Sequence, residues 1–375
     1  MTRAGLEVPE GSGLELLAEE AGLGGDVFEL IDAMGHEQVV FNHDPSCGYR
    51  SIIAVHDTTL GPSLGGTRFW QYETEREALV DVLRLSRGMT YKAAVAHLNL
   101  GGGKAVIMGD NKTLDREVVM RAHGRAVDAL GGRYITAEDV GVTVEDMDYV
   151  HMETEHVVGI MDRSGDPSPV TAYGVYRGMK ACALKSYRDD SLAGRSVAIQ
   201  GAGSVGYQLC RYLSREGAKL FVSDIDEVKV GRCSSDFGAE PVAPSEIYTV
   251  DADVFAPCAL GAVLNDETIP QFTFDIVAGA ANNQLASIGH GQLLSEKGII
   301  HAPDYVINAG GLINVYSELA GWSLERCKRK AGDIYSVLLT IFELAEDEGV
   351  TSTEAADKVA ERRLRRLGRL HRRSL

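Results

Sequence analysis

Two lysines, Lys92 and Lys104, lie on either side of three consecutive glycines in the otherwise apolar stretch 89–110. Two ammonium groups in one dry site repel each other, and repulsion and desolvation both lower a lysine pKa toward the range of a useful base. Because glycine loses much backbone entropy on folding, three in a row indicate that another group, which we expect to be a small ligand, approaches the main chain. The alternative is a glycine-rich surface turn with two solvated lysines.

A second group of candidate residues is a pair of carboxylates, Glu138 and Asp139, at the end of the strand predicted for residues 134–139. The loop that follows begins with Val140 and Gly141. Loops that follow strands commonly carry binding and catalytic residues. Asp139 is therefore a candidate site residue.

A third motif, G-x-G-x-x-G, follows the buried strand predicted for residues 196–200 and opens a helix that Gly217 ends. The next predicted strand, residues 220–224, ends in Asp224. This strand–turn–helix context, with an acidic residue about 20 positions on, is typical of a dinucleotide-binding fingerprint. The helix N-terminus would hold a pyrophosphate and Asp224 the adenosine ribose hydroxyls, whereas the alternative is a turn without a ligand. The loop residues of the motif are Gly201, Ala202, Gly203, Ser204, Val205 and Gly206.

Two polar loops, residues 280–284 and 308–312, are expected to lie after strands of the same half of the chain. Amide side chains such as those of Asn283 and Asn308 can orient a nicotinamide amide or a substrate carboxylate. Asparagine is also a common turn residue, so ordinary turn chemistry is the alternative.

The remaining elements follow from hydrophobic periodicity, capping residues and chain breakers. Thr74 and Glu77 form a capping box at the start of a helix that carries Lys92. The other expected elements are a weak helical pattern at 14–21, a helix at 27–34, strands at 38–41 and 51–56, a breaker-rich loop at 60–68, a strand at 105–108, helices at 114–130 and 172–183, a hinge at 163–169, strands at 253–256, 274–278 and 298–301, and helices from 323 onward.

Composition sets wider limits. A chain of 375 residues is long enough for two domains, and its net charge of −17 argues against general affinity for nucleic acids. No apolar run approaches a membrane span, and the six cysteines lack metal-ligand spacing, which favours a reduced cytoplasmic protein without a bound metal. The basic run at residues 362–373 is expected to be a solvated or subunit-contacting helix end.

Taken together, these motifs resemble those of the glutamate/leucine/phenylalanine/valine dehydrogenases, and most of all the leucine dehydrogenase branch. The resemblance runs from about residue 35 to the C-terminal helices, and residues 278–285 and 308–316 are also similar to tryptophan dehydrogenase. The segments that carry it are Tyr-Lys92, Leu-Asn-Leu-Gly-Gly-Gly-Lys104, Ala-Glu-Asp139-Val-Gly, the fingerprint at Gly201 and Pro-Asp-Tyr-Val-Ile-Asn308-Ala-Gly-Gly.

The resemblance implies oxidative deamination of an L-amino acid by NAD, which gives a 2-oxo acid, ammonia and NADH, and the reverse reductive amination. Lys92 would bind the substrate α-carboxylate, Lys104 would activate water as a general base, and Asp139 would exchange protons with the substrate nitrogen. Further site residues implied in this way are Gly65, Gly66 and Met89 at the substrate floor, and Thr171, Asn283 and Asn308 around the nicotinamide and the reacting carbon.

The substrate side chain is expected to be apolar. Glutamate-specific relatives carry a lysine where this chain has Leu64, and a buried carboxylate without its cation is unfavourable. Ala137, Leu312 and Val315 would complete an apolar pocket. Leucine-specific relatives commonly carry valine at the position of Leu312, but one methylene is worth only about 1–3 kcal/mol of discrimination.

Leucine, valine, isoleucine and aromatic substrates therefore stay open. An aromatic amino-acid dehydrogenase is the alternative within the enzyme class. A non-catalytic dinucleotide-binding protein with the same fold is the alternative from a different class. The subunit count and the physiological direction also stay open.

The implied architecture is α/β, with an N-terminal α/β substrate domain, a Rossmann-type dinucleotide domain and a cleft between them. We expect a partly ordered extension at 1–25, the substrate and oligomerisation domain at 26–162, the NAD domain at 163–322, and C-terminal helices at 323–375 whose last member packs back on the first domain. The family resemblance also implies a symmetric homo-oligomer, which for the leucine branch would be an octamer.

Overall fold

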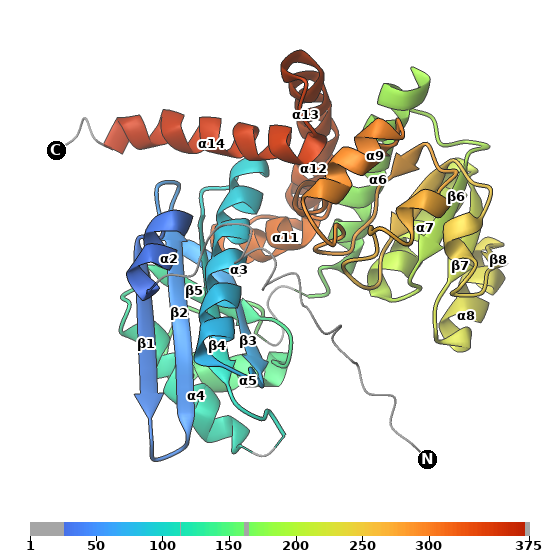
Figure 1. Cartoon of the computed structure of the whole chain (residues 1–375). Helices are drawn as coiled ribbons and strands as arrows, with labels where there is room; N and C mark the ends of the chain where they lie inside the picture. The colour runs from blue at the N-terminus through green and yellow to red at the C-terminus, as the bar shows by residue number, and fades with distance from the viewer. Residues whose placement is uncertain (1–25, 113, 161–164, 372–375) are drawn as a thin grey trace. The chain divides into compact units, whose positions relative to one another are not determined.

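A computed structural model describes residues 26–112, 114–160 and 165–371 of the chain. The weak helical pattern expected at 14–21 lies outside these residues. The chain divides into two compact units, Met1–Thr90 with Leu100–Ile160, and Tyr91–Asn99 with Met161–Leu375. Figure 1 shows the elements of both units along the colour gradient of the chain.

The first unit is built on a mixed sheet with the strand order β1-β2-β4-β3-β5. β1–β2 and β2–β4 are antiparallel, whereas β3 runs parallel to both β4 and β5. The strands are β1 (Gln38–Asp44), β2 (Tyr49–Asp57), β3 (Ser63–Trp70), β4 (Gly101–Met108) and β5 (Tyr134–Glu138), and the helices are α2 (Val27–Met34), α3 (Glu75–Val95), α4 (Arg116–Asp128) and α5 (Val144–His151).

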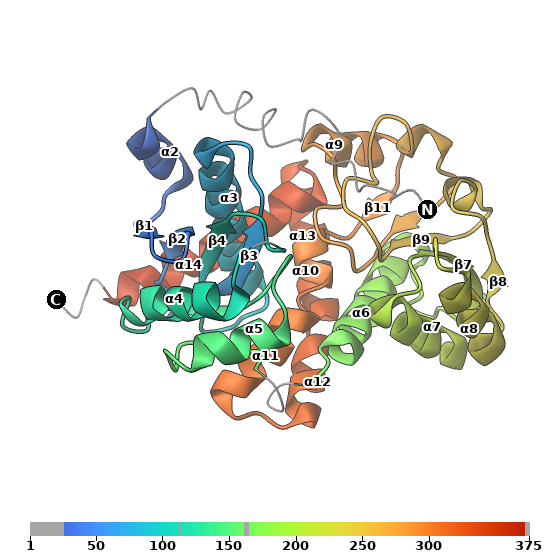
Figure 2. The same cartoon turned by 90° about the horizontal axis from the view of Figure 1, so that it is seen from below.

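Alternating residues of the strands face two different layers of helices. Ile52 and Ala54 of β2 pack with α2 and α3, whereas Ile53 and Val55 pack with α4. Figure 2 shows α4 and α5 on the side of the sheet away from α2 and α3. Because successive side chains of a strand point to opposite faces, the apolar residues of β2 are buried on both faces of the sheet.

The start of α3 confirms the predicted capping box. The Glu77 backbone N–H donates to Thr74 Oγ1 at 3.1 Å, and the Thr74 N–H donates to the Glu77 carboxylate at 3.4 Å. These bonds satisfy N–H groups that have no partner within the helix. The cap therefore sets where the helix that carries Met89 and Lys92 begins.

Two predictions about glycine-rich segments are wrong. Residues 60–68 were expected to form a loop, but β3 begins at Ser63, and β4 begins at Gly101 rather than at Ala105. A Cβ on Gly65 would lie 1.8 Å from the Gly103 carbonyl oxygen, and one on Gly102 would lie 2.1 Å from the Thr90 backbone nitrogen. At these positions glycine is required by a neighbouring strand and by the backbone of α3.

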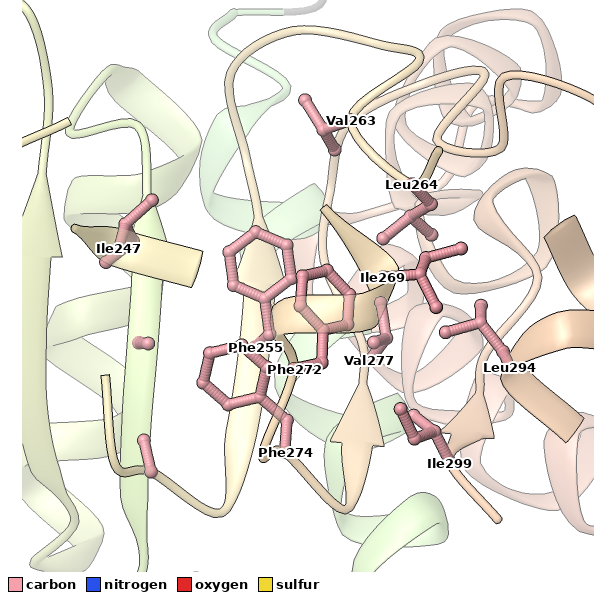
Figure 3. Packing of buried hydrophobic residues seen from close by; sticks show 12 residues of the cluster. Ile247, Phe255, Val263, Leu264, Ile269, Phe272, Phe274, Val277, Leu294 and Ile299 are labelled. Atoms are coloured by element: carbon pink, nitrogen blue, oxygen red, sulfur yellow. The ribbon is translucent and has the colours of Figure 1, made fainter. Parts of the chain in front are cut away.

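The second unit contains a parallel sheet with the strand order β11-β10-β9-β6-β7-β8, as the βαβ alternation predicts. Its strands are β6 (Ser196–Gln200), β7 (Lys219–Ser223), β8 (Glu240–Pro241), β9 (Val254–Pro257), β10 (Ile276–Val277) and β11 (Ile300–His301), and its first helices are α6 (Ser168–Tyr187), α7 (Ser204–Glu216), α8 (Glu227–Phe237) and α9 (Gly289–Glu296). An aromatic core of Phe255, Phe272 and Phe274 supports the sheet, with aliphatic residues around it (Figure 3).

The rest of the second unit is helical. The helices are α10 (Asp304–Ile307), α11 (Gly310–Ala320), α12 (Leu324–Gly332), α13 (Ile334–Glu348) and α14 (Ser352–His371). Residues 308–312 were expected to be a loop after a strand, but only Asn308 and Ala309 lie between α10 and α11, and residues 310–312 form the first turn of α11. No helix in the described ranges is long and apolar enough to cross a bilayer.

Part of the basic run at the end of the chain has a structural use within this unit. The Arg363 guanidinium of α14 donates to the carbonyl oxygens of Ala93, Ala94 and Leu98 at 3.3, 3.1 and 2.9 Å. A cation at a helix C-terminus satisfies carbonyls that have no partner in the helix and interacts favourably with the helix dipole. Arg363 therefore fixes the end of α3, next to Lys92.

Candidate functional site

The first unit holds a buried ion pair at the positions that the sequence singles out. Lys104 lies in β4 with 7% of its side chain exposed, and its Nζ is 3.0 Å from Asp139 Oδ1. Asp139 directly follows β5, and β3 lies between β4 and β5 in the sheet. The sheet therefore brings together a lysine and a carboxylate that are far apart in the sequence.

The electrostatic surroundings keep both groups of the pair available for proton transfer. Burial is the main cause that holds the pKa of Lys104 below its usual range; Asp139 opposes this, and the Arg68 charge adds to it. We expected Lys92 to supply such repulsion, and the structure adds Arg68 as a cation that contributes it. Burial favours a neutral Asp139, yet Lys104 and Arg68 together hold its pKa below the usual range.

The apolar and small residues predicted for the substrate floor lie on β3, β5 and α3 of the same unit, and Gly66 lies next to Asp139. Leu64 is 2% exposed in β3, and Gly66 pairs with Ala137 of β5. A Cβ on Gly66 would lie 2.8 Å from the Asp139 Cβ, and one on Gly65 would lie 3.3 Å from Met89 Cγ. A side chain at either glycine would therefore crowd the floor. Lys92 is half-buried in the last turn of α3, one turn beyond Met89.

The second unit carries the glycine motif in a form that fits a dinucleotide. Gly201 has a φ of 106°, and a Cβ on Gly206 would lie 1.9 Å from the Gly201 carbonyl oxygen, so both positions require glycine. α7 begins with Ser204 and Val205, and no side chain of the described residues caps it. A Cβ on Gly203 would have no described atom within 4 Å, which leaves open space in front of the helix N-terminus for a pyrophosphate.

Asp224 lies directly after β7 and is held by the backbone. Its Oδ2 accepts a hydrogen bond from the Ala202 N–H at 2.7 Å, and its Oδ1 accepts one from the Asp226 N–H at 2.9 Å. A carboxylate has about four acceptor sites, so capacity remains for two ribose hydroxyls. The fingerprint loop and its acidic residue are therefore joined before any ligand binds.

The asparagines of the second unit differ in their surroundings. Asn308 is 4% exposed, and its Nδ2 donates to Ala280 O at 3.1 Å and to Asn282 Oδ1 at 2.7 Å. Its Oδ1 is buried and has no hydrogen-bond partner among the described residues. An unsatisfied buried acceptor is unfavourable, so a donor from a ligand would stabilise this group. Asn283 is exposed, in a left-handed backbone conformation with a φ of 50°.

The last predicted site residues of this unit lie where α6 meets α11. Thr171 is buried in α6 and donates to Pro167 O at 3.0 Å, and a Cβ on Gly311 would lie 3.3 Å from Thr171 Oγ1. Leu312 is buried and Val315 half-buried on α11. The residues predicted for the substrate floor thus lie in the first unit. The residues predicted to bind the cofactor lie in the second unit, as do Leu312 and Val315 of the predicted side-chain pocket.

Sequence reasoning missed three residues next to the ion pair, namely Arg68, Tyr72 and Asp81. Arg68 Nε donates to Asp139 Oδ2 at 3.1 Å, and Tyr72 and Arg68 both donate to Asp81. A usable signal was present, because Asp81 is the charged residue in the otherwise apolar run 78–83 of a helix expected to pack on the sheet. A carboxylate on a buried helix face requires a charged or hydrogen-bonding partner.

Comparisons with known proteins agree with this geometry. Residues 36–156 match the Glu/Leu/Phe/Val dehydrogenase dimerisation domain, and residues 222–367 match the Glutamate/Leucine/Phenylalanine/Valine dehydrogenase domain. Leucine dehydrogenase from Thermoactinomyces intermedius is 54% identical over 90% of this chain and 93% of its own length. Phenylalanine dehydrogenase from Bacillus thermotolerans is 47% identical over 91% of this chain and 92% of its own length.

A solved structure extends the similarity to three dimensions. The crystal structure of L-tryptophan dehydrogenase from Nostoc punctiforme has a TM-score of 0.84 and 49% identity, over 91% of this chain and 99% of that one. The two family domains and the long, highly identical matches agree with the two α/β units. The chain belongs to the glutamate/leucine/phenylalanine/valine dehydrogenase family, and it is a dinucleotide-dependent amino-acid dehydrogenase.

Proposed function

We propose that the protein catalyses the NAD-dependent oxidative deamination of branched-chain L-amino acids, and the reverse reductive amination. The observation that carries this proposal is the ion pair between the buried Lys104 and Asp139, with the buried, apolar Leu64 on the strand next to that of Lys104. The leucine dehydrogenase relatives, such as the one that is 54% identical, support a branched aliphatic substrate. We further propose that the first unit supplies Lys104, Asp139 and the substrate floor, and that the second unit binds NAD.

In this proposal the residues of the chain divide the work of binding and proton transfer. Lys92 binds the substrate α-carboxylate. The Lys104 amine, whose pKa burial lowers, accepts a proton from the water that attacks the substrate carbon. Asp139 exchanges protons with the substrate nitrogen, and Leu64, Ala137, Leu312 and Val315 contact the substrate side chain.

The residues of the second unit hold the cofactor. The backbone at Gly201, Gly203 and Gly206 leaves room for the pyrophosphate, Asp224 binds the adenosine ribose, and Thr171, Asn283 and Asn308 contact the nicotinamide side. The chemistry that NAD would supply there is acceptance of the hydride from the substrate α-carbon. The unsatisfied Oδ1 of Asn308 fits this assignment, because it can accept a hydrogen bond from an amide or an amine.

The experiment that tests the proposal measures NADH formation by the purified protein with each standard L-amino acid. We expect the highest kcat/KM for leucine, valine and isoleucine and negligible activity on glutamate, because Leu64 offers no charge to a second carboxylate. A preference for phenylalanine or tryptophan would instead support the aromatic dehydrogenase alternative. No oxidation of any amino acid, with NAD still bound, would favour a non-catalytic dinucleotide-binding protein.

We also propose that the protein is a homo-oligomer, with an octamer as the expected state, and that it works in the cytoplasm. The first family domain is described as a dimerisation domain, and all six cysteines are unpaired. Sedimentation velocity at micromolar concentration should show one large symmetric species, and a stable monomer would contradict the assembly. Cell fractionation that places the enzyme outside the cytoplasm would contradict the location.

A further inference from the structure

The guanidinium of Arg68 connects the reacting pair to a second, buried carboxylate. Its Nε donates to Asp139 Oδ2 at 3.1 Å, and its Nη1 donates to Asp81 Oδ2 at 2.8 Å. Asp81 projects from α3 with 7% of its side chain exposed, and it also accepts a hydrogen bond from the Tyr72 hydroxyl at 2.7 Å. Arg68 thus bridges a carboxylate on the helix to the carboxylate that follows β5.

This arrangement determines the orientation of the Asp139 side chain. Oδ1 of Asp139 faces Lys104 and Oδ2 faces Arg68, and among the described residues these two cations are its hydrogen-bonding partners. If Arg68 were absent, the carboxylate could rotate about its Cβ–Cγ bond, since a single ion pair does not fix both oxygens. The planar guanidinium presents donors in fixed directions, which a lysine ammonium does not do.

Arg68 itself is held in place and stays charged. Burial works against its charged form, but Asp81 and Asp139 together raise its pKa above the usual value. Burial and the neighbouring Asp81 raise the pKa of Tyr72, so its hydroxyl stays protonated and keeps donating to Asp81. The anchor formed by Asp81 and Tyr72 is therefore present over the whole working pH range.

We propose that Arg68, anchored by Asp81 and Tyr72, is a positioning residue that fixes the Asp139 carboxylate for proton exchange with the substrate nitrogen. The inference deepens the proposed function and rests on it for the role of Asp139. A second consequence concerns Lys104, because the Arg68 charge adds to burial in lowering the pKa of its amine. Loss of Arg68 should therefore move the acidic limb of the pH–rate profile, which follows Lys104, to higher pH.

The test compares Arg68→Gln, Arg68→Lys and Asp81→Asn with the wild type. Arg68→Gln should lower kcat by roughly 100-fold, since a small misplacement of a reacting group has an effect of this size. Its acidic limb should shift to higher pH, whereas KM for NAD should stay near the wild-type value. Arg68→Lys keeps the positive charge but lacks the planar set of guanidinium donors. Compared with Arg68→Gln, it should therefore return the acidic limb to the wild-type pH but recover little of kcat. Asp81→Asn should lower kcat less than Arg68→Gln.

A matched control separates this role from a merely structural one. Arg121 of the same unit makes an ion pair with Glu153 at 2.7 Å, away from the Lys104–Asp139 pair. Arg121→Gln should leave kcat and the pH profile unchanged, whatever its effect on the melting temperature. The proposal is overturned if Arg68→Gln keeps the wild-type acidic limb, or if Arg68→Lys recovers full kcat.

A readout that needs no turnover separates this inference from the proposed function. The rate of Lys104 acetylation by acetic anhydride, followed by peptide mass spectrometry as a function of pH, reports the protonation of the amine directly. The midpoint should rise in Arg68→Gln and return toward the wild-type value in Arg68→Lys. An unchanged midpoint overturns the link between Arg68 and Lys104, whereas a wild type that oxidises no amino acid overturns the proposed function instead.

Discussion

Replacement of Lys104 by alanine should lower turnover by roughly 10²–10⁴-fold, the usual contribution of a general base. The amine is buried beside Asp139 and has a lowered pKa, so no bulk-water base can easily take its place. Steady-state kinetics with the preferred amino acid would measure the loss. Dinucleotide binding, followed by the fluorescence of NADH, should be retained because the fingerprint loop lies in the other unit.

Two comparisons make the Lys104 result interpretable. Lys92→Ala should mainly raise the KM of the amino acid, as expected for a residue that binds the α-carboxylate, with a smaller fall in kcat. A thermal melt of Lys104→Ala is needed because the substitution leaves the Asp139 carboxylate with Arg68 as its remaining cation. Near-normal turnover in a folded Lys104→Ala protein would remove Lys104 from the role of base.

The wild type should strongly prefer NAD over NADP. Asp224→Ser should lower the ratio of kcat/KM for NAD to kcat/KM for NADP by about 100-fold or more. A 2′-phosphate would lie against the Asp224 carboxylate, and two like unit charges 4 Å apart repel by roughly 4 kcal/mol at an intermediate dielectric. The nearby Lys229 does not compensate, because its Nζ is 3.3 Å from Asp226 in an exposed ion pair. The measurement is the ratio of kcat/KM for the two cofactors in each protein.

Asp236→Ser provides a control for this comparison. Asp236 lies on helix α8 and accepts a hydrogen bond from the Tyr207 hydroxyl of α7 at 2.7 Å. The Asp236→Ser substitution therefore removes a negative charge from the same unit without changing the residue proposed to bind the ribose. The ratio should stay close to the wild-type value in that variant. Equal use of NADP by the wild type, or an unchanged ratio in Asp224→Ser, would contradict the role of Asp224.

Local sequence signals predicted those elements whose causes are themselves local. The capping box at Thr74 and the strand–turn–helix context of the fingerprint depend on residues within a few positions of each other, and both agree with the structure. β3 could not be predicted in this way, because Gly65 and Gly66 are normally unfavourable in a strand. They are tolerated because partners distant in the sequence, Gly103 and Glu138, leave no room for a Cβ.

The candidate site shows the same division between local and distant causes. The lysine and the carboxylate were recognisable from their types and positions, and the sheet brings Lys104 and Asp139 together. The contribution of Arg68 to the lowered pKa of Lys104 was not predicted, because repulsion depends on distance in space and the sequence suggested only Lys92 as a neighbouring cation. Arg68 is 36 positions from Lys104 in the sequence but lies on the adjacent strand.

The tight fit of β4 against α3 restricts how this enzyme can be altered by evolution or by design. Every residue of β4 is buried, and a Cβ on Gly102 would lie 2.3 Å from the Ser86 carbonyl oxygen. Variation at Gly102 would therefore separate the helix from the sheet, and variation at Gly101 or Gly103 would push neighbouring strands apart, before any preference among amino acids changed. New substrate ranges are accessible instead through side chains at the floor, such as Leu64 and Ala137, whose bulk can change while the glycines beneath Lys104 stay invariant.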